Sequence, residues 1–491
     1  MFKVAFMNWI IIAVGTYFVM LITVCIFIIF QTHSTNKTLA YLLFCFFVPV
    51  IGMFFYLIFG INYWRIKRYD RKREQDAELL KQLKNSVVKY DEVSTSSIDK
   101  TSDQYNELSS MLIKELGSPL TGNNTVQLLI NGEQKFPVMM QAISEATHHI
   151  YVEYYIYEYD QTGTALVELL IQKAKQGVQV KFIYDDFGSP TIKKKIAQRM
   201  QKAGVEIHPF YKVRFYFLAN RLNYRNHRKI VVIDGRTAFV GGINVSDKYV
   251  NKSDGEFSER LFWRDTHVRI DGPAVYYLQY LFMSDWNFCC QQPLIPDAAY
   301  FGDAKTSGRG SYVQIAANGP DSQQPAVLFS ILQAIYLAKE EILITTPYFI
   351  PGDSILDALR VAAISGLVVK LLVPGKADSK LVNAASKSNY DDLLNAGVEI
   401  YLYQKGFVHA KTLVTDGKLT VIGTANMDHR SFELNFEVNA IVYDTTIAGQ
   451  MRDVFFEDLQ GAQKIDKEAW LNRPWYVKFP ERLARLFSPV L

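Results

Sequence analysis

Two long apolar runs open the chain, separated by a short polar stretch at residues 31–38. Residues 7–30 are almost continuously apolar and carry no charged side chain. A helix rises 1.5 Å per residue, so this run can cross the hydrocarbon core of a bilayer, about 30 Å thick. A second apolar run covers about residues 39–59. Because a secretory signal peptide has a shorter apolar core and a small-residue cleavage site, the pattern predicts a two-helix transmembrane hairpin over residues 1–60.

Basic residues around these runs predict the orientation of the hairpin. The stretch between the runs contains a single one, Lys37, whereas six follow the second run: Arg65, Lys67, Arg68, Arg71, Lys72 and Arg73. Lysine and arginine are retained on the cytoplasmic side of a membrane. Both termini are therefore expected in the cytoplasm. The same basic cluster can bind anionic lipid head groups, at about 1 kcal/mol per charge.

The end of the chain shows an amphipathic helical pattern. Arg482 and Arg485 lie off an apolar face made of Leu483, Leu486, Phe487 and Val490, and two tryptophans precede it, Trp470 and Trp475. Two interpretations stay open: a short helix at a membrane interface, or a helix packed on the protein's own core.

Between these ends, apolar runs alternate with helical patterns from about residue 121 onward, which is typical of an α/β architecture. The preceding residues 61–120 are basic at first and then rich in Ser, Thr and Asp, and they are interpreted as a juxtamembrane connector.

The α/β region contains an internal duplication. The segment Ala-Gly-Val-Glu-Ile occurs at residues 203–207 and again at 396–400, and the predicted elements around it follow the same order. The duplication predicts two lobes, at residues 121–295 and 310–491, separated by a loop rich in Gly, Ser and Asp. A pseudo-twofold relation would place the same residues of each lobe at one shared interface.

Each predicted lobe carries the same polar signature. It consists of His227, Lys229, Asp234 and Asn244 in the first lobe, and of His409, Lys411, Asp416 and Asn426 in the second. The spacing is identical in the two copies. His and Lys two positions apart on a strand point to the same face. One such motif arises easily by chance, but two at matched positions of a duplicated chain indicate a site.

This set of side chains suits substitution at a phosphodiester. The lysines and asparagines can bind the non-bridging oxygens as charge develops. One histidine can attack phosphorus and form a phosphohistidine, while the other protonates the leaving alkoxide and deprotonates the incoming hydroxyl. A histidine also needs its second nitrogen held, and Asp265 and Glu437 are the candidates for this role. Asp234 and Asp416 belong to the signature, but each precedes a turn glycine, which favours a role in fixing the turn.

Charge and cysteine content exclude other classes. The net charge of +4 is small for 491 residues and argues against a nucleic-acid-binding protein. Cys25, Cys45, Cys289 and Cys290 form neither a disulfide framework nor a C-x-x-C metal pair. The remaining histidines have no ligand spacing, so no metal and no cofactor is expected.

The paired H-x-K-x4-D motifs, followed by G-G-x-N at 241–244 and G-T-x-N at 423–426, resemble the phospholipase D superfamily. With the two predicted spans, the Phe-Trp-Arg-Asp segment at 262–265 and the Thr-Pro-Tyr-Phe-Ile-Pro segment at 346–351, the resemblance narrows to bacterial cardiolipin synthases. It implies two α/β lobes, each with a sheet between helices, in a multi-pass protein of the bacterial inner membrane. It also implies transfer of a phosphatidyl group between two phosphatidylglycerol molecules with release of glycerol. His227 would be the nucleophile and His409 the acid and base.

Three alternatives remain. A phospholipase would give the phosphatidyl group to water. A membrane-tethered nuclease would need a basic groove with stacking aromatics, which the charge balance disfavours. A non-catalytic scaffold would not need both intact motifs. Phosphatidylglycerol and anionic lipids are the expected partners, and a homo-oligomer is compatible with the sequence.

Overall fold

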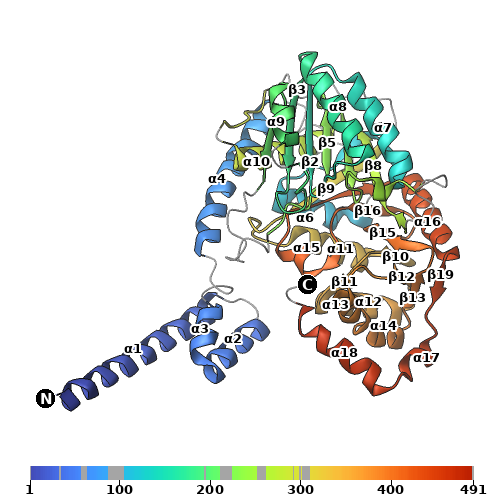
Figure 1. Ribbon diagram of the computed structural model, residues 1–491. Helices are drawn as coiled ribbons and strands as arrows, with labels where there is room; N and C mark the ends of the chain where they lie inside the picture. The colour runs from blue at the N-terminus through green and yellow to red at the C-terminus, as the bar shows by residue number, and fades with distance from the viewer. Residues whose placement is uncertain are drawn as a thin grey trace. The chain divides into compact units, whose positions relative to one another are not determined.

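The computed structural model describes residues 2–31, 35–56, 63–86, 104–192, 195–210, 224–251, 261–290, 292–297, 300 and 310–488. The chain divides into two compact units (Figure 1). The small unit comprises Met1–Arg71 and Val213–Tyr224, and the large unit comprises Lys72–Lys212 and Arg225–Leu491. Helix α4 (Tyr63–Ser86) begins in the small unit and ends in the large one.

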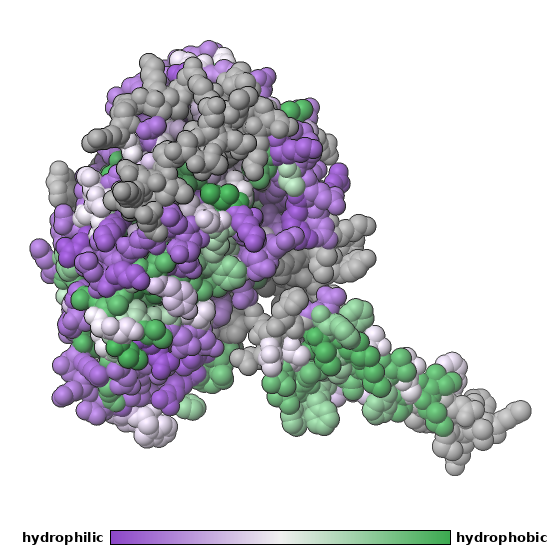
Figure 2. Space-filling model, turned by 180° about the vertical axis from the view of Figure 1, so that it is seen from behind, coloured by the Kyte–Doolittle hydropathy of each residue, from purple (hydrophilic) through white to green (hydrophobic). Residues whose placement is uncertain are grey.

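Among the described residues of the small unit, one helix is long and apolar enough to cross a membrane. This helix is α1 (Phe2–Gln31), whose window Val14–Gln31 has a mean hydropathy of 2.3 and is only 11% buried. Apolar side chains cover the described part of its surface, which is coloured green in Figure 2. The composition and exposure of α1 fit a helix surrounded by lipid.

The second apolar run is not one continuous helix in the described residues, so the second span of the predicted hairpin is not confirmed. It forms α2 (Thr35–Phe47) and α3 (Pro49–Phe55), and its residues 57–59 lie outside the described part. Pro49 is the cause, because a proline excludes the preceding residue from the helical region, and Val48 accordingly has φ −133° and ψ 66°. Gly52 permits a tight turn back, since a Cβ there would lie 2.6 Å from the Phe44 carbonyl oxygen.

The large unit contains two lobes whose main sheet strands follow the same order along the chain, although the second lobe has additional short elements. The first lobe contains β1 (Thr121–Ile130), α7 (Asn131–Glu145), β2 (His149–Tyr154), α8 (Gln161–Lys175), β3 (Gln179–Tyr184), α9 (Lys195–Lys202), β4 (Glu206–Pro209), β5 (Ile230–Ile233), β6 (Thr237–Gly241), β7 (Phe262–Arg264), β8 (Thr266–Asp271) and α10 (Val275–Cys289). The second contains β9 (Ser311–Asn318), α11 (Ala326–Leu337), β10 (Glu341–Thr345), β11 (Phe349–Ile350), α12 (Asp353–Ile364), β12 (Val368–Pro374), α13 (Lys380–Lys387), α14 (Tyr390–Ala396), β13 (Glu399–Tyr403), β14 (Gly406–Val408), β15 (Thr412–Thr415), β16 (Leu419–Gly423), β17 (Met427–Asp428), α15 (His429–Glu433), β18 (Glu437–Tyr443), α16 (Thr445–Gln460), β19 (Ala462–Lys464), α17 (Lys467–Leu471) and α18 (Trp475–Arg485).

The sheets of the two lobes join into one 15-stranded sheet. Seven strands of the first lobe run in the order β4-β3-β2-β5-β6-β8-β1, their counterparts run β13-β12-β10-β15-β16-β18-β9, and β19 extends one edge. The halves meet where β1 and β9 pair antiparallel, with Thr121 opposite Val313. This join is the centre of the pseudo-twofold, so the lobes share a sheet rather than packing as separate ones.

Each lobe has its own apolar core, because its central strands are covered by helices on both faces and are apolar along their length. Part of the predicted connector contributes to the second of these cores. Helix α6 (Asn106–Leu116) buries Leu108 and Leu112 there, and the Tyr105 hydroxyl lies 3.1 Å from the Thr415 hydroxyl. Residues 87–103 of the connector lie outside the described part.

Helix α18 packs on the protein's own core on one side and exposes apolar residues on the other, and the interpretation as an interfacial helix stays a prediction. One side packs on α13, where Ala484 is buried. The other side exposes Trp475 (76%), Phe479 (58%) and Leu486 (74%). Val490 lies outside the described residues.

Candidate active site

The backbone before each histidine pairs with the opposite lobe. The His227 N–H donates to the Phe436 carbonyl at 2.9 Å. This hydrogen bond joins the residues just before β5 to those just before β18. The His409 N–H donates to the Arg264 carbonyl at 2.7 Å, because β14 pairs parallel with β7. These hydrogen bonds bring both histidines to the interface between the lobes, where the duplication predicts the site.

Each histidine is held by a carboxylate of the other lobe. The distance from His227 Nδ1 to Glu437 Oε2 is 2.9 Å, and the distance from His409 Nδ1 to Asp265 Oδ2 is 2.7 Å. Both carboxylates are fully buried. The sequence identifies both carboxylates, but it does not indicate that each one binds the histidine of the opposite lobe. We call this arrangement the crossing. Neither lobe alone therefore contains a complete half-site.

The lysines lie beside the histidines of their own motifs. Lys229 Nζ donates to the His227 carbonyl at 2.7 Å, and Lys411 Nζ lies 2.8 Å from His409 Nδ1. Burial lowers the pKa of Lys229 to about 7 and that of Lys411 to about 8, although the nearby carboxylates oppose it. An anionic phosphodiester between the two ammonium groups would supply the missing negative charge and favour their protonated forms.

The two histidines differ in their electrostatic surroundings. Burial, then the charges of the two lysines, lowers the pKa of His227 well below its ordinary value. Burial and Lys411 lower the pKa of His409 to about 4, while the neighbouring Asp265 opposes this. Burial raises the pKa of Glu437 to about 7. Burial also raises the pKa of Asp265, but Lys411 and His409 outweigh it and hold that carboxyl below its ordinary value. His409 therefore has the more fully ionised partner.

The two asparagines differ as well. The Asn244 side chain accepts from the Ile156 N–H at 3.2 Å and donates to the Tyr249 hydroxyl at 2.8 Å, so it supports the loop around the site. In the described part of the chain, the buried Oδ1 of Asn426 has no hydrogen-bond partner. A substrate hydroxyl is a donor that would satisfy it.

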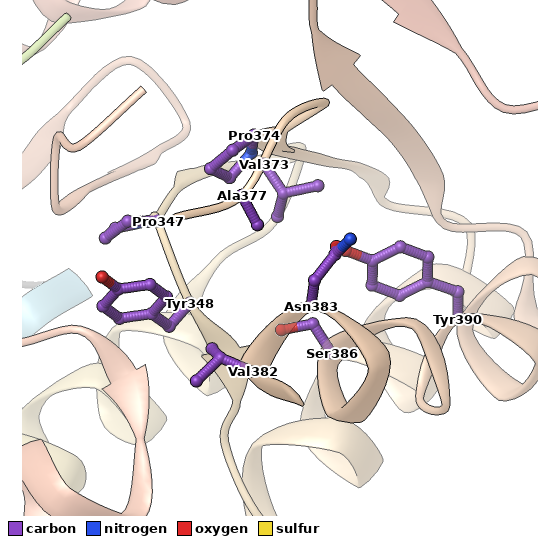
Figure 3. Close-up of a pocket in the computed structure, with 9 residues that line it drawn as sticks. All are labelled: Pro347, Tyr348, Val373, Pro374, Ala377, Val382, Asn383, Ser386 and Tyr390. Atoms are coloured by element: carbon purple, nitrogen blue, oxygen red, sulfur yellow. The ribbon is translucent and has the colours of Figure 1, made fainter. Parts of the chain in front are cut away.

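A small pocket lies on the second lobe (Figure 3), lined by Pro347, Tyr348, Val373, Pro374, Ala377, Val382, Asn383, Ser386 and Tyr390. Tyr348 forms one end of it, and Asn383 and Tyr390 lie together at the other. The Tyr348 hydroxyl donates to Asp378, whose charge in turn acts on Lys411. The free space of this pocket holds roughly one water molecule. The pocket is therefore too small for a lipid head group.

Comparison with known proteins identifies the family. The family described as cardiolipin synthase, PLD-like domain, matches residues 139–258 and 331–459, and the phospholipase D-nuclease N-terminal family matches residues 19–60. The major cardiolipin synthase of Bacillus subtilis is 40% identical over 98% of this chain and 99% of its own length. The cardiolipin synthase of Geobacillus kaustophilus is 40% identical over 94% of this chain and 90% of its own. The chain belongs to the cardiolipin synthase family of the phospholipase D superfamily. The predicted activity, a phosphatidyl transfer that makes cardiolipin at a membrane, is confirmed at this level.

A solved structure shows the same fold. The phosphatidylserine synthase of Haemophilus influenzae has a TM-score of 0.56 with 12% sequence identity, and the match covers 79% of this chain and 100% of that one.

In this cardiolipin synthase, the aspartates of the two motifs lie away from the histidines. The Asp234 carboxylate accepts from the backbone N–H groups of residues 147–149 at 2.8–2.9 Å, and Asp416 accepts in the same way from residues 339–341. Both have positive φ (52° and 54°), which aspartate tolerates better than most residues. They connect the β5–β6 and β15–β16 turns to the starts of β2 and β10, as the turn interpretation predicts.

A buried network next to His227 was not anticipated. The Arg228 guanidinium donates to Asp285, and Lys72 Nζ lies 2.8 Å from Asp321 Oδ2 and 3.6 Å from Asp285 Oδ1. Lys72, which the sequence places in a lipid-facing basic cluster, is only 3% exposed, and this corrects that assignment. The side chains of residues 65, 67 and 68 lie outside the described part. Asp285 and Asp321 are far from Lys72 in sequence, so they gave no local signal for this burial.

We expect Asp265→Asn to lose at least a hundredfold in cardiolipin turnover with little loss of stability. The amide of asparagine can hold His409 in the wrong tautomer. In catalytic triads the same replacement lowers kcat by several orders of magnitude. Asp234→Ala should show the reverse: thermal unfolding in detergent at a lower temperature, from a loss of about 1–3 kcal/mol as backbone donors lose their acceptor, with near-normal turnover below that temperature. Normal turnover by Asp265→Asn would contradict the role of the carboxylate.

Proposed function

We propose that the chain moves a phosphatidyl group from one phosphatidylglycerol to a second one, through a phosphohistidine on His227. Cardiolipin is two phosphatidyl groups joined by one glycerol, so attack by the free hydroxyl of phosphatidylglycerol on a bound phosphatidyl group yields it. The observation that carries the proposal is the crossed pair of histidine–carboxylate hydrogen bonds beside two buried lysines. A nucleophile and an acid at one site are what a double displacement needs.

The chemical steps balance as follows. His227 Nε2 attacks the phosphorus of the first lipid while the bond from phosphorus to the oxygen of the head-group glycerol breaks. His409 Nε2 gives its proton to that oxygen, and neutral glycerol leaves. The hydroxyl of the second lipid then attacks phosphorus, His409 takes its proton, and the phosphorus–nitrogen bond breaks. Lys229 and Lys411 stabilise the charge on the non-bridging oxygens in both steps.

The assignment of His227 as nucleophile rests on the difference between the carboxylates. A nucleophilic imidazole must be neutral, and burial beside two lysines, with a partner carboxyl whose pKa is raised to about 7, favours that form of His227. A general acid must hold a proton, and the ionised Asp265 stabilises the imidazolium of His409 once an anionic substrate is bound.

Purified enzyme in phosphatidylglycerol vesicles should form equal amounts of cardiolipin and free glycerol, measured by mass spectrometry. His227→Ala and His409→Ala should each reduce turnover below detection while keeping the unfolding temperature. Phosphatidic acid as the main product would instead establish a phospholipase that uses water. No lipid product, together with cleavage of nucleic acid, would establish the nuclease.

A phosphatidyl ester of p-nitrophenol tests which histidine attacks, because its leaving group departs without an acid. We expect His409→Ala to release one equivalent of p-nitrophenol per enzyme in a burst and to retain a phosphatidyl group on His227. His227→Ala should give no burst. A burst from His227→Ala that is absent from His409→Ala would reverse the assignment.

We also propose that α1 and the α2–α3 segment enter a bacterial inner membrane as a two-pass hairpin, with the large unit in the cytoplasm. The match of the N-terminal family to residues 19–60 includes the end of α1 and both short helices, which supports a single membrane module. The charge asymmetry around the runs supports the orientation.

A thiol-labelling experiment tests this topology. In a variant whose four native cysteines are replaced by alanine, Lys37→Cys should react with a membrane-impermeant maleimide added to intact spheroplasts. Lys114→Cys, exposed on α6, should react only after the membrane is opened. If neither position is labelled in intact spheroplasts and both are labelled after opening, position 37 lies on the cytoplasmic side. The proposed crossing of the membrane by α1 would then be wrong.

A further inference from the structure

The C-terminal helix α18 and the turn after it expose an apolar face. Six large side chains form this face, and each is at least 49% exposed: Trp475, Tyr476, Phe479, Leu483, Leu486 and Phe487. Successive residues of a helix are turned by about 100°, so these six side chains lie on roughly one third of its circumference. Apolar side chains gathered on one exposed face indicate an interaction surface.

The other side of α18 is fixed to the second lobe. Ala484 belongs to a buried cluster with Ala385 of α13 and Ile350 of β11. Glu481, also buried, accepts two hydrogen bonds from the Arg473 guanidinium at 2.9 Å each. This packing sets the direction of the helix, and the apolar face therefore points away from the lobe.

Basic side chains border the apolar face. Arg482 and Arg485 are exposed in the last turn of α18. The helical spacing places them on the same border as Lys478, which pairs with Asp391 at 3.2 Å. The one acidic residue of α18, Glu481, is on the buried side. The exposed surface is thus apolar with a positive border, which is typical of a helix that lies in a membrane interface.

The charge of this surface favours an anionic bilayer over a second copy of the chain. A twofold dimer uses the same patch on both copies. An interface built on α18 would therefore bring Arg482 and Arg485 toward their own equivalents, and like charges repel. Anionic lipids, on which a cardiolipin synthase acts, attract arginine at the bilayer surface instead. Tryptophan and tyrosine are also enriched at membrane interfaces.

Helix α18 is attached close to the second motif. It packs against Ile350 of β11, and β11 pairs parallel with β17, where Phe349 lies opposite Met427. Met427 directly follows Asn426 of the second motif. A surface that holds α18 therefore also holds this side of the candidate active site.

We propose that α18 lies in the surface of an anionic bilayer, with its apolar face inserted at the level of the lipid head groups. The contact keeps the second lobe beside the lipid layer that contains phosphatidylglycerol. This inference goes beyond the proposed function, because it does not depend on which histidine attacks or on which acceptor is used.

Fluorescence quenching by lipids tests the insertion. The whole chain, with its four native cysteines replaced by alanine, is reconstituted in phosphatidylglycerol nanodiscs that contain a lipid with a nitroxide on its acyl chain. A nitrobenzoxadiazole label on Phe479→Cys should be strongly quenched, and the same label on Glu168→Cys, exposed on α8, should not. Equal quenching at the two positions would overturn the inference.

The contribution of charge is measured with the same label. Arg482→Gln with Arg485→Gln, or nanodiscs of phosphatidylcholine, should reduce the quenching at position 479. Unchanged quenching in both cases would contradict a contact with anionic lipids. A shift of the label to shorter wavelength without quenching by the lipid nitroxide would show a protein cover, such as a second copy, and would also overturn the inference.

Activity gives an independent readout. Replacement of Trp475, Phe479 and Leu486 by serine should lower cardiolipin formation in phosphatidylglycerol vesicles at least threefold without changing the unfolding temperature. With a short-chain phosphatidylglycerol dissolved in detergent, the same variant should match the wild type. The matched control, Val361→Ser with Ile364→Ser, removes exposed apolar side chains from α12 and should change neither reaction.

Two results of this assay would contradict the docking role of α18. An equal loss in vesicles and in detergent would show that α18 serves the fold or the chemistry, and no loss in either would show that it is dispensable. Absence of cardiolipin from the wild-type reaction would reject the proposed function, while the quenching experiment, which needs no turnover, would still decide the docking.

Discussion

Two hydrogen bonds, each between a histidine of the candidate site and a buried carboxylate of the opposite lobe, are the interactions on which the site depends. They form because β14 pairs with β7 and because the residues just before β5 are hydrogen-bonded to those just before β18. Each lobe thus supplies the histidine of one half-site and the carboxylate of the other. The common sheet, joined through β1 and β9, fixes the two lobes in the position where both bonds are made. The duplication has consequently produced one active site rather than two.

Two buried lysines make the candidate site favourable for an anionic ligand. Burial lowers the pKa of Lys229 to about 7 and of Lys411 to about 8, which means that the protonated forms gain from any anion placed between them. A phosphodiester is such an anion, and its arrival would charge the lysines at the moment when they are needed. The two halves are not equivalent, because Asp265 is ionised more readily than Glu437. This difference, absent from the motif itself, supports the separate roles proposed for the two histidines.

Much of the site could be predicted from the sequence, because duplicated motifs with identical spacing are local patterns. The two lobes, the histidines, the lysines and the two supporting carboxylates all follow from such patterns. The crossing does not, since nothing near Asp265 or Glu437 in sequence indicates a partner in the other lobe. The burial of Lys72 depends likewise on distant acids. The break in the second apolar run did have a local signal, because Pro49 excludes Val48 from a helical conformation. A hydropathy profile does not reveal this break.

The most direct test of the crossed arrangement is an NMR spectrum of the enzyme with 15N-labelled histidine side chains, with His227 and His409 assigned by substitution to Gln. If the carboxylates act across the interface, Glu437→Gln will shift the ring-nitrogen resonances of His227 and leave those of His409 in place, and Asp265→Asn will do the opposite. If each substitution instead shifts the histidine of its own lobe, the half-sites are not crossed and the account of the active site is wrong.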